Sequence, residues 1–317
     1  MAASHGRDHK LCVWQLRADD FENLSTRLPV DGATPIDQKQ PWLLHTMSVN
    51  ALNFCAFATC TDLDAGVNEE SAFVPLLLAA PNGLDSGGVD IFQLPSERRV
   101  SKVQSDKNVN TGMVMSLRIF GGQSGCALTL IVGYEDGQVM VYRRKDQNVM
   151  PVWIWEQILL GRPHKQPVLS LDITPDHAAF ITSSADALIA RYAISKSESK
   201  QTVPEKFNNT KHAGQQDLKI RSDGRVFATA GWDKNVRVYS VKSLKELAVL
   251  NWHQEGCYAV AFAEILHTAT PESVEMDKLA ETNAMTRLNK ERDVKVHNTH
   301  WLVAGSKDGK ISLWDIY

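Results

Sequence analysis

Two sets of hydroxyl, imidazole and carboxylate side chains are the residues of this 317-residue chain whose types could do chemistry. They are His164, Thr182 and Asp186, and then His212, Thr229 and Asp233. These groups could form a nucleophilic triad, in which the histidine takes the proton of the hydroxyl. They could equally satisfy one another as a buried polar network that holds a turn. The set occurs twice along the chain, which favours the structural interpretation.

An aspartate followed six residues later by an aromatic residue recurs through the sequence. The pairs are Asp8–Trp14, Asp136–Tyr142, Asp186–Tyr192, Asp233–Tyr239 and Asp308–Trp314, and a sixth that is one residue longer, Asp85–Phe92. Turns of the Asp-Gly type tolerate positive φ, and the apolar residues that follow alternate with a period of two. Each pair therefore predicts a β-hairpin.

Further apolar runs lie upstream of these hairpins and complete a larger unit. Examples are Leu128–Val132 and Val114–Ile119 before Asp136, and Val49–Phe54 before Asp85. Each unit then supplies roughly four strands, which is the composition of a propeller blade. The spacing between the turn aspartates stretches twice, and the extra residues predict inserted loops at 17–40, 59–71 and 266–299.

Composition narrows the class of protein further. The chain is 43% hydrophobic with a net charge of −3, so it can form a sizeable core and has no general basic field for nucleic acid. Its five cysteines lack CxxC spacing and are expected to be reduced thiols. No apolar stretch is long enough for a membrane span, and the N-terminus lacks the apolar segment of a signal peptide. We expect no cofactor and a nuclear or cytoplasmic location.

The Asp turns, the closing Trp314-Asp315 pair and the histidines upstream of the turns resemble the WD-repeat family of β-propellers. The resemblance implies an all-β propeller of the seven-bladed type, forming a single domain over residues 1–317. Within that family, His5–Leu16, Pro41–Phe57 and Gly305–Tyr317 are similar to the fungal WD-repeat subunits of the ASTRA complex.

The family resemblance also implies a role for the polar residues. It places them in a structural network that joins the histidine before the first strand, the hydroxyl on the second, the turn aspartate and the aromatic residue of the third. Its expected members are His164, Thr182, Asp186, His212, Thr229, Asp233, Tyr239, Asp308 and Trp314. Val132 and Ala304 occupy the hydroxyl position in two other units, so the network is expected to be incomplete there.

The function that this resemblance implies is a non-catalytic scaffold in a nuclear multiprotein complex. The implied partners are a kinase-like ASTRA subunit, the Tel2–Tti cochaperones and RuvB-like ATPases. The implied process is chromatin regulation or the assembly of phosphatidylinositol-kinase-like proteins. Three alternatives stay open: a G-protein-β-like signalling scaffold, a substrate receptor of a ubiquitin ligase, and a propeller enzyme.

Three further features each have a structural and a functional interpretation. His297 and His300, with His267, could be metal ligands, but exposed histidines at a loop are favoured because two further ligands are lacking. The basic clusters Arg98-Arg99 and Arg143-Arg144-Lys145 are expected to be solvated, with an acidic partner as the alternative. Apolar residues recur at helical spacing from Met276 to Leu288 after a helix start at Thr270-Pro271, within what is otherwise a charged loop.

The start of the chain leads to the last expectation. The first hairpin begins at His5, so the first blade (residues 5–57) is expected to lack its first two strands. The chain would then be an N-terminally shortened propeller of about six blade-like units with an unclosed ring.

Overall fold

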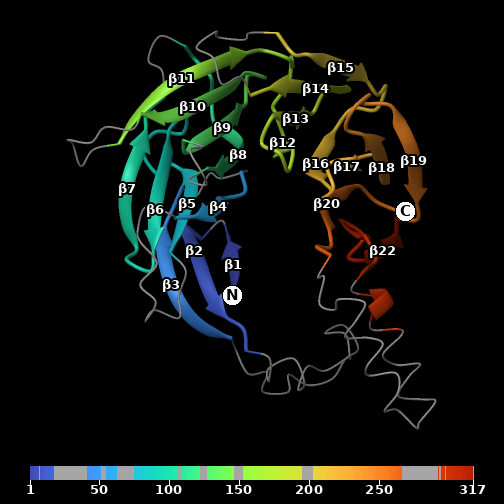
Figure 1. The fold of residues 1–317 in the computed structure, drawn as a ribbon, viewed down its shortest axis with the longest axis horizontal. Coiled ribbons are helices and arrows are strands. Elements are labelled where there is room, and N and C mark those ends of the chain that lie inside the picture. Colours follow the sequence, from blue (N-terminus) through green and yellow to red (C-terminus); the bar gives the residue numbers. More distant parts are fainter. Residues whose placement is uncertain are drawn as a thin grey trace, which may run out of the picture. The chain divides into compact units, whose positions relative to one another are not determined.

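The computed structural model describes residues 1–6, 8–17, 41–50, 55–62, 75–105, 109–121, 127–145, 153–194, 203–265, 292, 294–296 and 298–316. These residues form two compact units, one comprising Met1–Glu135 with Met140–Leu159 and the other Asp136–Val139 with Leu160–Tyr317. The described strands assemble into six sheets of three or four strands each (Figure 1). The prediction of an all-β fold built from propeller blades is confirmed, while the single domain stays a prediction.

The first unit contains three sheets, in which strands adjacent in sequence pair with one another. The first sheet consists of β1 (Ala2–His5), β2 (Lys10–Gln15) and β3 (Trp42–Ser48). The second consists of β4 (Ala58–Thr61), β5 (Leu76–Pro81), β6 (Val89–Leu94) and β7 (Arg98–Val103). The third consists of β8 (Val114–Phe120), β9 (Thr129–Tyr134), β10 (Val139–Lys145) and β11 (Ile154–Gly161).

The second unit repeats the arrangement. Its sheets are β12 (Ser170–Ile173), β13 (Ala179–Ser183), β14 (Leu188–Ala193) and β15 (Lys206–Asn209); β16 (Gln215–Ile220), β17 (Val226–Gly231), β18 (Asn235–Ser240) and β19 (Glu246–Asn251); and β20 (Cys257–Phe262), β21 (Trp301–Ser306) and β22 (Ile311–Asp315). Residues 292, 294–296 and 298, between β20 and β21, are helical. Residues 276–288, where the sequence allows a docking helix as the alternative to a partly disordered loop, lie outside the described residues.

Alternation of apolar side chains explains why neighbouring sheets stack. In the first unit, Leu11, Val13 and Met47 of the first sheet pack on Leu78 and Leu94 of the second. In the second unit, the sheets β12–β15 and β16–β19 share another apolar cluster that contains Ile181, Ile189, Leu218 and Phe227. Because each strand puts every second side chain on one face, a blade can bury apolar residues against its neighbour while polar residues face away.

Two strands differ from the prediction. β1 precedes the first hairpin and pairs with β2 from Ala2↔Trp14 to His5↔Leu11, so the first blade lacks one preceding strand within the described residues, not two. β4 occupies Ala58–Thr61, so the expected loop 59–71 begins inside a strand. Both strands are four residues long and made of small or polar side chains, so they carry no apolar alternation by which the sequence could reveal them.

Candidate functional site

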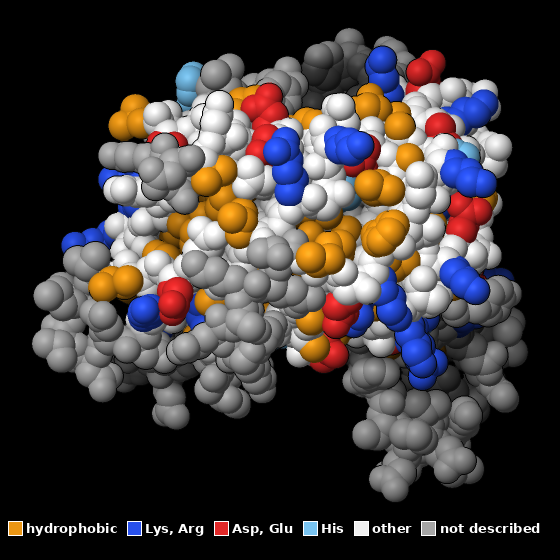
Figure 2. Space-filling model, turned by 90° about the horizontal axis from the view of Figure 1, so that it is seen from above, with side chains coloured by type: hydrophobic (Ala, Val, Ile, Leu, Met, Phe, Trp, Pro, Cys, Tyr) orange, Lys and Arg blue, Asp and Glu red, His pale blue; other side chains and the backbone are white. Residues whose placement is uncertain are grey.

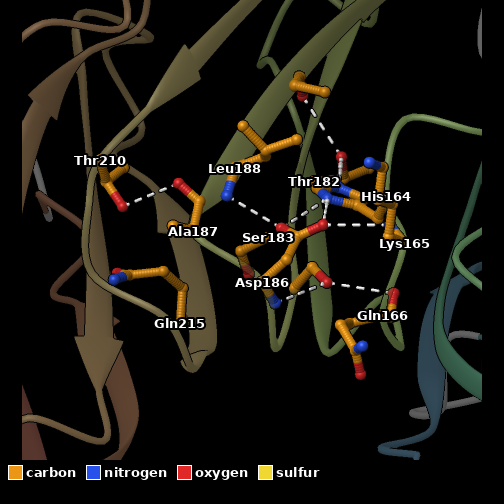
Figure 3. Close-up of polar contacts among 12 residues, drawn as sticks. His164, Lys165, Gln166, Thr182, Ser183, Asp186, Ala187, Leu188, Thr210 and Gln215 are labelled. Atoms are coloured by element: carbon orange, nitrogen blue, oxygen red, sulfur yellow. Dashed lines mark hydrogen bonds and ion pairs between the residues drawn. The ribbon is translucent and has the colours of Figure 1, made fainter.

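His164, Thr182 and Asp186 form one connected polar group in the sheet β12–β15 (Figure 3). His164 Nε2 lies 2.9 Å from Thr182 Oγ1, and His164 Nδ1 lies 3.1 Å from Asp186 Oδ1. The Asp186 carboxylate also accepts hydrogen bonds from the backbone amides of Lys165 at 3.1 Å and Leu188 at 2.8 Å. The histidine, hydroxyl and aspartate of the predicted network are joined in this blade and tie the β13–β14 turn to the segment before β12, whereas the hydroxyl of the third-strand residue Tyr192 makes no hydrogen bond.

The chemistry available to this group is limited by its burial. Thr182 is completely buried and His164 is 1% exposed, so no substrate carbonyl can reach the hydroxyl in this conformation. Burial raises the pKa of Asp186, but the hydrogen bond and charge of His164 and the two amides outweigh it and lower that pKa overall. An aspartate with a lowered pKa whose carboxylate accepts several hydrogen bonds suits a structural turn better than a proton relay.

A second complete network occurs in the sheet β20–β22, with a histidine that sequence reasoning missed. His253 Nδ1 lies 3.2 Å from Asp308 Oδ2, and His253 Nε2 lies 2.9 Å from the hydroxyl of Ser312. Trp314 Nε1 donates to the same hydroxyl at 2.9 Å, so both predicted residues, Asp308 and Trp314, belong to the group. His253 lies 55 residues before Asp308, and the insertion between β20 and β21 hid this pairing from the repeat spacing.

In this blade the hydroxyl of the network lies on the third strand of the repeat unit instead of the second. Ala304 of β21 was expected to leave the network incomplete, yet it lies directly opposite Ser312 of β22. In the sheet β12–β15 the corresponding pair is reversed, with Thr182 on the second strand opposite Ala190 on the third. Directly opposite residues share a face, so a hydroxyl on either strand can reach the same histidine.

The sheet β16–β19 corrects the predicted role of His212. His212 is half-exposed and its Nδ1 lies 3.6 Å from Asp233, while the Thr229 hydroxyl bonds to Gln215 instead of the imidazole. The buried guanidinium of Arg237 binds Asp233 instead, with Nη1 at 3.0 Å and Nη2 at 2.5 Å. Because a bidentate Arg–carboxylate pair is stronger than a single imidazole contact, Arg237 displaces the histidine.

Thr229 keeps a buried partner by another route. Its hydroxyl donates to Gln215 Oε1 at 2.5 Å, and Gln215 Nε2 donates to the carbonyl of His212 at 2.9 Å. Tyr239 contributes by stacking on Phe227 with ring centroids 5.1 Å apart, and burial raises the pKa of its hydroxyl. Thr229 lies opposite Arg237, so the residue four positions after the turn aspartate again faces the second-strand position.

The same position varies in the first unit. Ser4 of β1 lies opposite Cys12, and Trp14 Nε1 donates to the Ser4 hydroxyl at 2.8 Å. In the third sheet, Val132 is apolar as predicted, and the hydroxyl of Tyr142 donates to the sulfur of Met140 at 3.0 Å. The aromatic side chain thus bonds either to the residue four places after the aspartate, as with Met140, or to the residue opposite that position on the second strand, as with Ser4.

Two aspartates on innermost strands form a further set that the sequence did not reveal. Asp172 of β12 accepts a hydrogen bond from the Ile220 amide of β16 at 2.8 Å. Asp217 of β16 accepts one from the Val260 amide of β20 at 3.0 Å and one from the Ser170 hydroxyl of β12 at 3.0 Å. Asp217 therefore links three consecutive sheets of the second unit.

Other candidates give no second site among the described residues. No group of three His, Cys, Asp or Glu side chains there is placed to hold a metal ion, and His267 and His297 lie outside that part of the chain. The described cysteines Cys12, Cys55, Cys60 and Cys257 form no disulfide bond. No helix in the described part of the chain has the length and hydropathy needed to cross a bilayer.

Comparison with known proteins gives consistent matches. The family model "WD domain, G-beta repeat" matches residues 206–240 and 295–315, which cover the blade of Asp233 and the blade of Asp308. The chain is 46% identical to ASTRA-associated protein 1 of Penicillium rubens, over 99% of this chain and 81% of the relative. It is 47% identical to ASTRA-associated protein 1 of Verticillium alfalfae, over 99% of this chain and 76% of the relative. It is also 27% identical to mouse guanine nucleotide-binding protein subunit beta-like protein 1, over 99% of this chain and 74% of that protein.

Proposed function

Because the chain belongs to the ASTRA-associated protein 1 family of WD-repeat proteins, we propose that it is a non-catalytic scaffold subunit of an ASTRA-like complex. Similarity of 46–47% that extends over 99% of the chain is the observation that carries the proposal. It includes the loops between blades as well as the strands, and in repeat folds such loops hold the partner-binding residues.

The geometry of the polar groups supports a scaffold over an enzyme. The two hydroxyl, histidine and aspartate sets that could do nucleophilic chemistry lie buried, and their hydrogen bonds hold turns. The surface has a different character. Figure 2 shows exposed hydrophobic side chains close to charged ones on the face seen there, a mixture typical of surfaces that bind proteins. Trp232, Trp252 and Tyr258 are each about half exposed in the second unit, and such residues often anchor partners.

The proposal extends to the cellular location, the process and the partners of that scaffold. We expect a nuclear location and a role in chromatin regulation and in the assembly of phosphatidylinositol-kinase-like proteins. The partners that this predicts are a kinase-like subunit, the Tel2–Tti cochaperones and RuvB-like ATPases. We expect no direct contact with nucleic acid or membrane.

Affinity purification tests this proposal. The tagged chain would replace the endogenous ASTRA-associated protein 1 of a filamentous fungus, and co-purified proteins would be quantified by mass spectrometry against an untagged strain. Enrichment of the kinase-like subunit together with the Tel2–Tti proteins is expected. Recovery of the tagged chain without any of them would contradict complex membership.

A second candidate function rests on the similarity to the mouse protein named as G-protein-β-like. A G-protein-β-like signalling scaffold would share the blades and the Asp turns. The same purification separates the two candidates, because recovery of a G-protein γ chain in place of the kinase-like subunit would favour signalling. The lower identity of 27%, against 46–47%, places this candidate second.

A further inference from the structure

The outer strands of the first unit carry a local excess of positive charge. Strands β7, β10 and β11 contain six cationic residues and one carboxylate, Glu156; the cations are Arg98, Arg99, Lys102, Arg143, Arg144 and Lys145. The whole chain has a net charge of −3, so this excess is confined to one region. Five of the six cations are the two basic clusters of the sequence, and the polar networks do not use them.

A hydrogen bond between the second and third sheets places the two basic clusters near each other. Trp155 Nε1 on β11 donates to the Ser101 hydroxyl on β7 at 2.9 Å, which joins the outermost strands of the second and third sheets. Ser101 lies opposite Ile91 and Arg98 lies opposite Gln93, so Arg98 and Ser101 share the face toward Trp155.

Trp153 orients one of the cations. The guanidinium of Arg144 lies 4.8 Å from the centre of a Trp153 ring, and Trp153 and Trp155 have ring centroids 6.4 Å apart. A guanidinium that stacks on an indole loses little freedom on binding, and its edge still offers a pair of N–H donors suited to a carboxylate. β7 begins at Arg98, and Trp153 directly precedes β11. Arg98 and the Arg144 side chain that stacks on Trp153 therefore both lie near the start of an outer strand, on the same side of the Ser101–Trp155 hydrogen bond.

One carboxylate close to these cations binds its partner only weakly. Lys145 lies 3.3 Å from Glu156, and the two side chains are 50% and 52% exposed. Surface pairs of this kind contribute little and exchange readily with other anions. A partner that supplies several carboxylates in one segment would gain more than each single pair loses.

We propose that this basic rim, defined as Arg98, Arg144, Lys145 and Trp153, binds an acidic peptide segment of a protein partner. The segment would lie across the outer strands β7 and β11, with carboxylates paired to Arg98 and Arg144 and its backbone against the Trp153 ring. An acidic peptide fits better than nucleic acid, because the cations cover one part of a chain whose net charge is negative.

The test measures peptide binding to the purified full-length chain, and it needs no other complex subunit. A fluorescein-labelled 12-residue peptide of Glu, Asp, Gly and Ser would be titrated with the chain and followed by fluorescence anisotropy. Arg98→Glu combined with Arg144→Glu is expected to weaken binding roughly tenfold or more, since the two charge-assisted contacts with the peptide become repulsive. The matched control is Lys242→Glu combined with Lys245→Glu, which makes the same charge change at exposed positions of the second unit.

Trp153→Ala separates the stacked site from a purely electrostatic effect. It leaves the net charge unchanged and is expected to weaken binding several-fold, while the melting temperature of each variant is measured to check its fold. Equal weakening by the rim and control variants would overturn the proposal, as would equal binding of an uncharged Gly-Ser peptide. Tighter binding of single-stranded RNA of the same charge would overturn it in favour of a nucleic-acid surface. Complex membership does not enter any of these outcomes.

Discussion

A turn aspartate in this protein is held by whichever partner the neighbouring strands bring to it. His164 binds Asp186, His253 binds Asp308, and Arg237 binds Asp233. In each case a side-chain nitrogen lies close to a carboxylate that also accepts backbone amides. The turn is therefore fixed by charge-assisted hydrogen bonds whose donor differs from blade to blade.

Asp233→Ala tests the pair that replaces the histidine. We expect it to lower the free energy of unfolding by about 1–3 kcal/mol, because Arg237 is 3% exposed and would keep only the Glu246 contact at 3.4 Å. Urea unfolding followed by tryptophan fluorescence measures the change. The double variant Asp233→Ala with Arg237→Met should recover a large part of the loss, since no buried charge then stays unpaired. A single variant as stable as the wild type would show that the pair does not hold this turn.

The network hydroxyl lies on the third strand at Ser312 and on the second strand at Thr182, and this difference leads to a second prediction. Ser312→Ala should cost about 1–3 kcal/mol, because it removes the partner of both His253 and the Trp314 N–H. Ala304→Ser combined with Ser312→Ala moves the hydroxyl to the opposite residue without changing the total volume, as in the Thr182–Ala190 pair. Thermal denaturation should show that the double variant is more stable than Ser312→Ala alone. Equal melting temperatures would mean that the position of the hydroxyl cannot be exchanged.

The ionisation of Asp308 is expected to make the stability of the fold depend on pH. Burial raises its pKa, but hydrogen bonds from the amides of Gln254 and Lys310 and from His253 and Ser306 bring the pKa to about 2, below the ordinary value of 3.8. A lowered pKa in the folded state stabilises the fold above the unfolded-state pKa, and this contribution is lost as the pH falls from about 4 toward 2. The stability difference between the wild type and Asp308→Asn should therefore be largest at pH 5 and shrink on acidification. A difference that stays constant between pH 5 and pH 3 would contradict this pKa.

At the scale of elements, the hairpins show how much the sequence predicts. The Asp-to-aromatic spacing predicts all six third strands, whereas the network of His164, Thr182 and Asp186 was implied by the resemblance to WD-repeat proteins. β1 and β4 escaped prediction because their residues are small or polar. Arg237 and Ser312 escaped because a strand register decides which side chains face each other, and the register is a tertiary property.

Two glycines in equivalent turns allow a matched test of one element. Gly137 and Gly309 each follow a turn aspartate and have φ of +88° and +75°. Alanine at either position would cost about 1 kcal/mol from the left-handed backbone conformation. At Gly137 the added Cβ would also lie 2.3 Å from the His164 carbonyl oxygen, whereas at Gly309 nothing lies within 4 Å.

Gly137→Ala should therefore destabilise the protein by clearly more than Gly309→Ala. Chemical denaturation of the two variants under identical conditions gives the comparison, and Gly309→Ala serves as the control for backbone strain. Equal losses would show that the β9–β10 turn and the segment before β12 can move apart at no cost.

At the scale of the whole molecule, the sheets of the second unit are joined by contacts that no single blade contains. Asp217 bonds to β12 and β20 from its own strand β16, and apolar clusters lie on both sides of that strand's sheet. Repeats that depend on their neighbours in this way form a rigid platform from short elements. Such a platform can present loops and outer strands to several partners at once, which is what a scaffold subunit requires.

The assembly state of the chain in a fungal extract tests the scaffold proposal most directly. The tagged chain would be separated on a native density gradient, and every fraction would be quantified by mass spectrometry. Our account predicts that this 35.2 kDa chain sediments in an assembly many times its own mass, in the same fractions as the kinase-like subunit and the Tel2–Tti proteins. Sedimentation of the chain at its own mass, away from those proteins, would contradict the account.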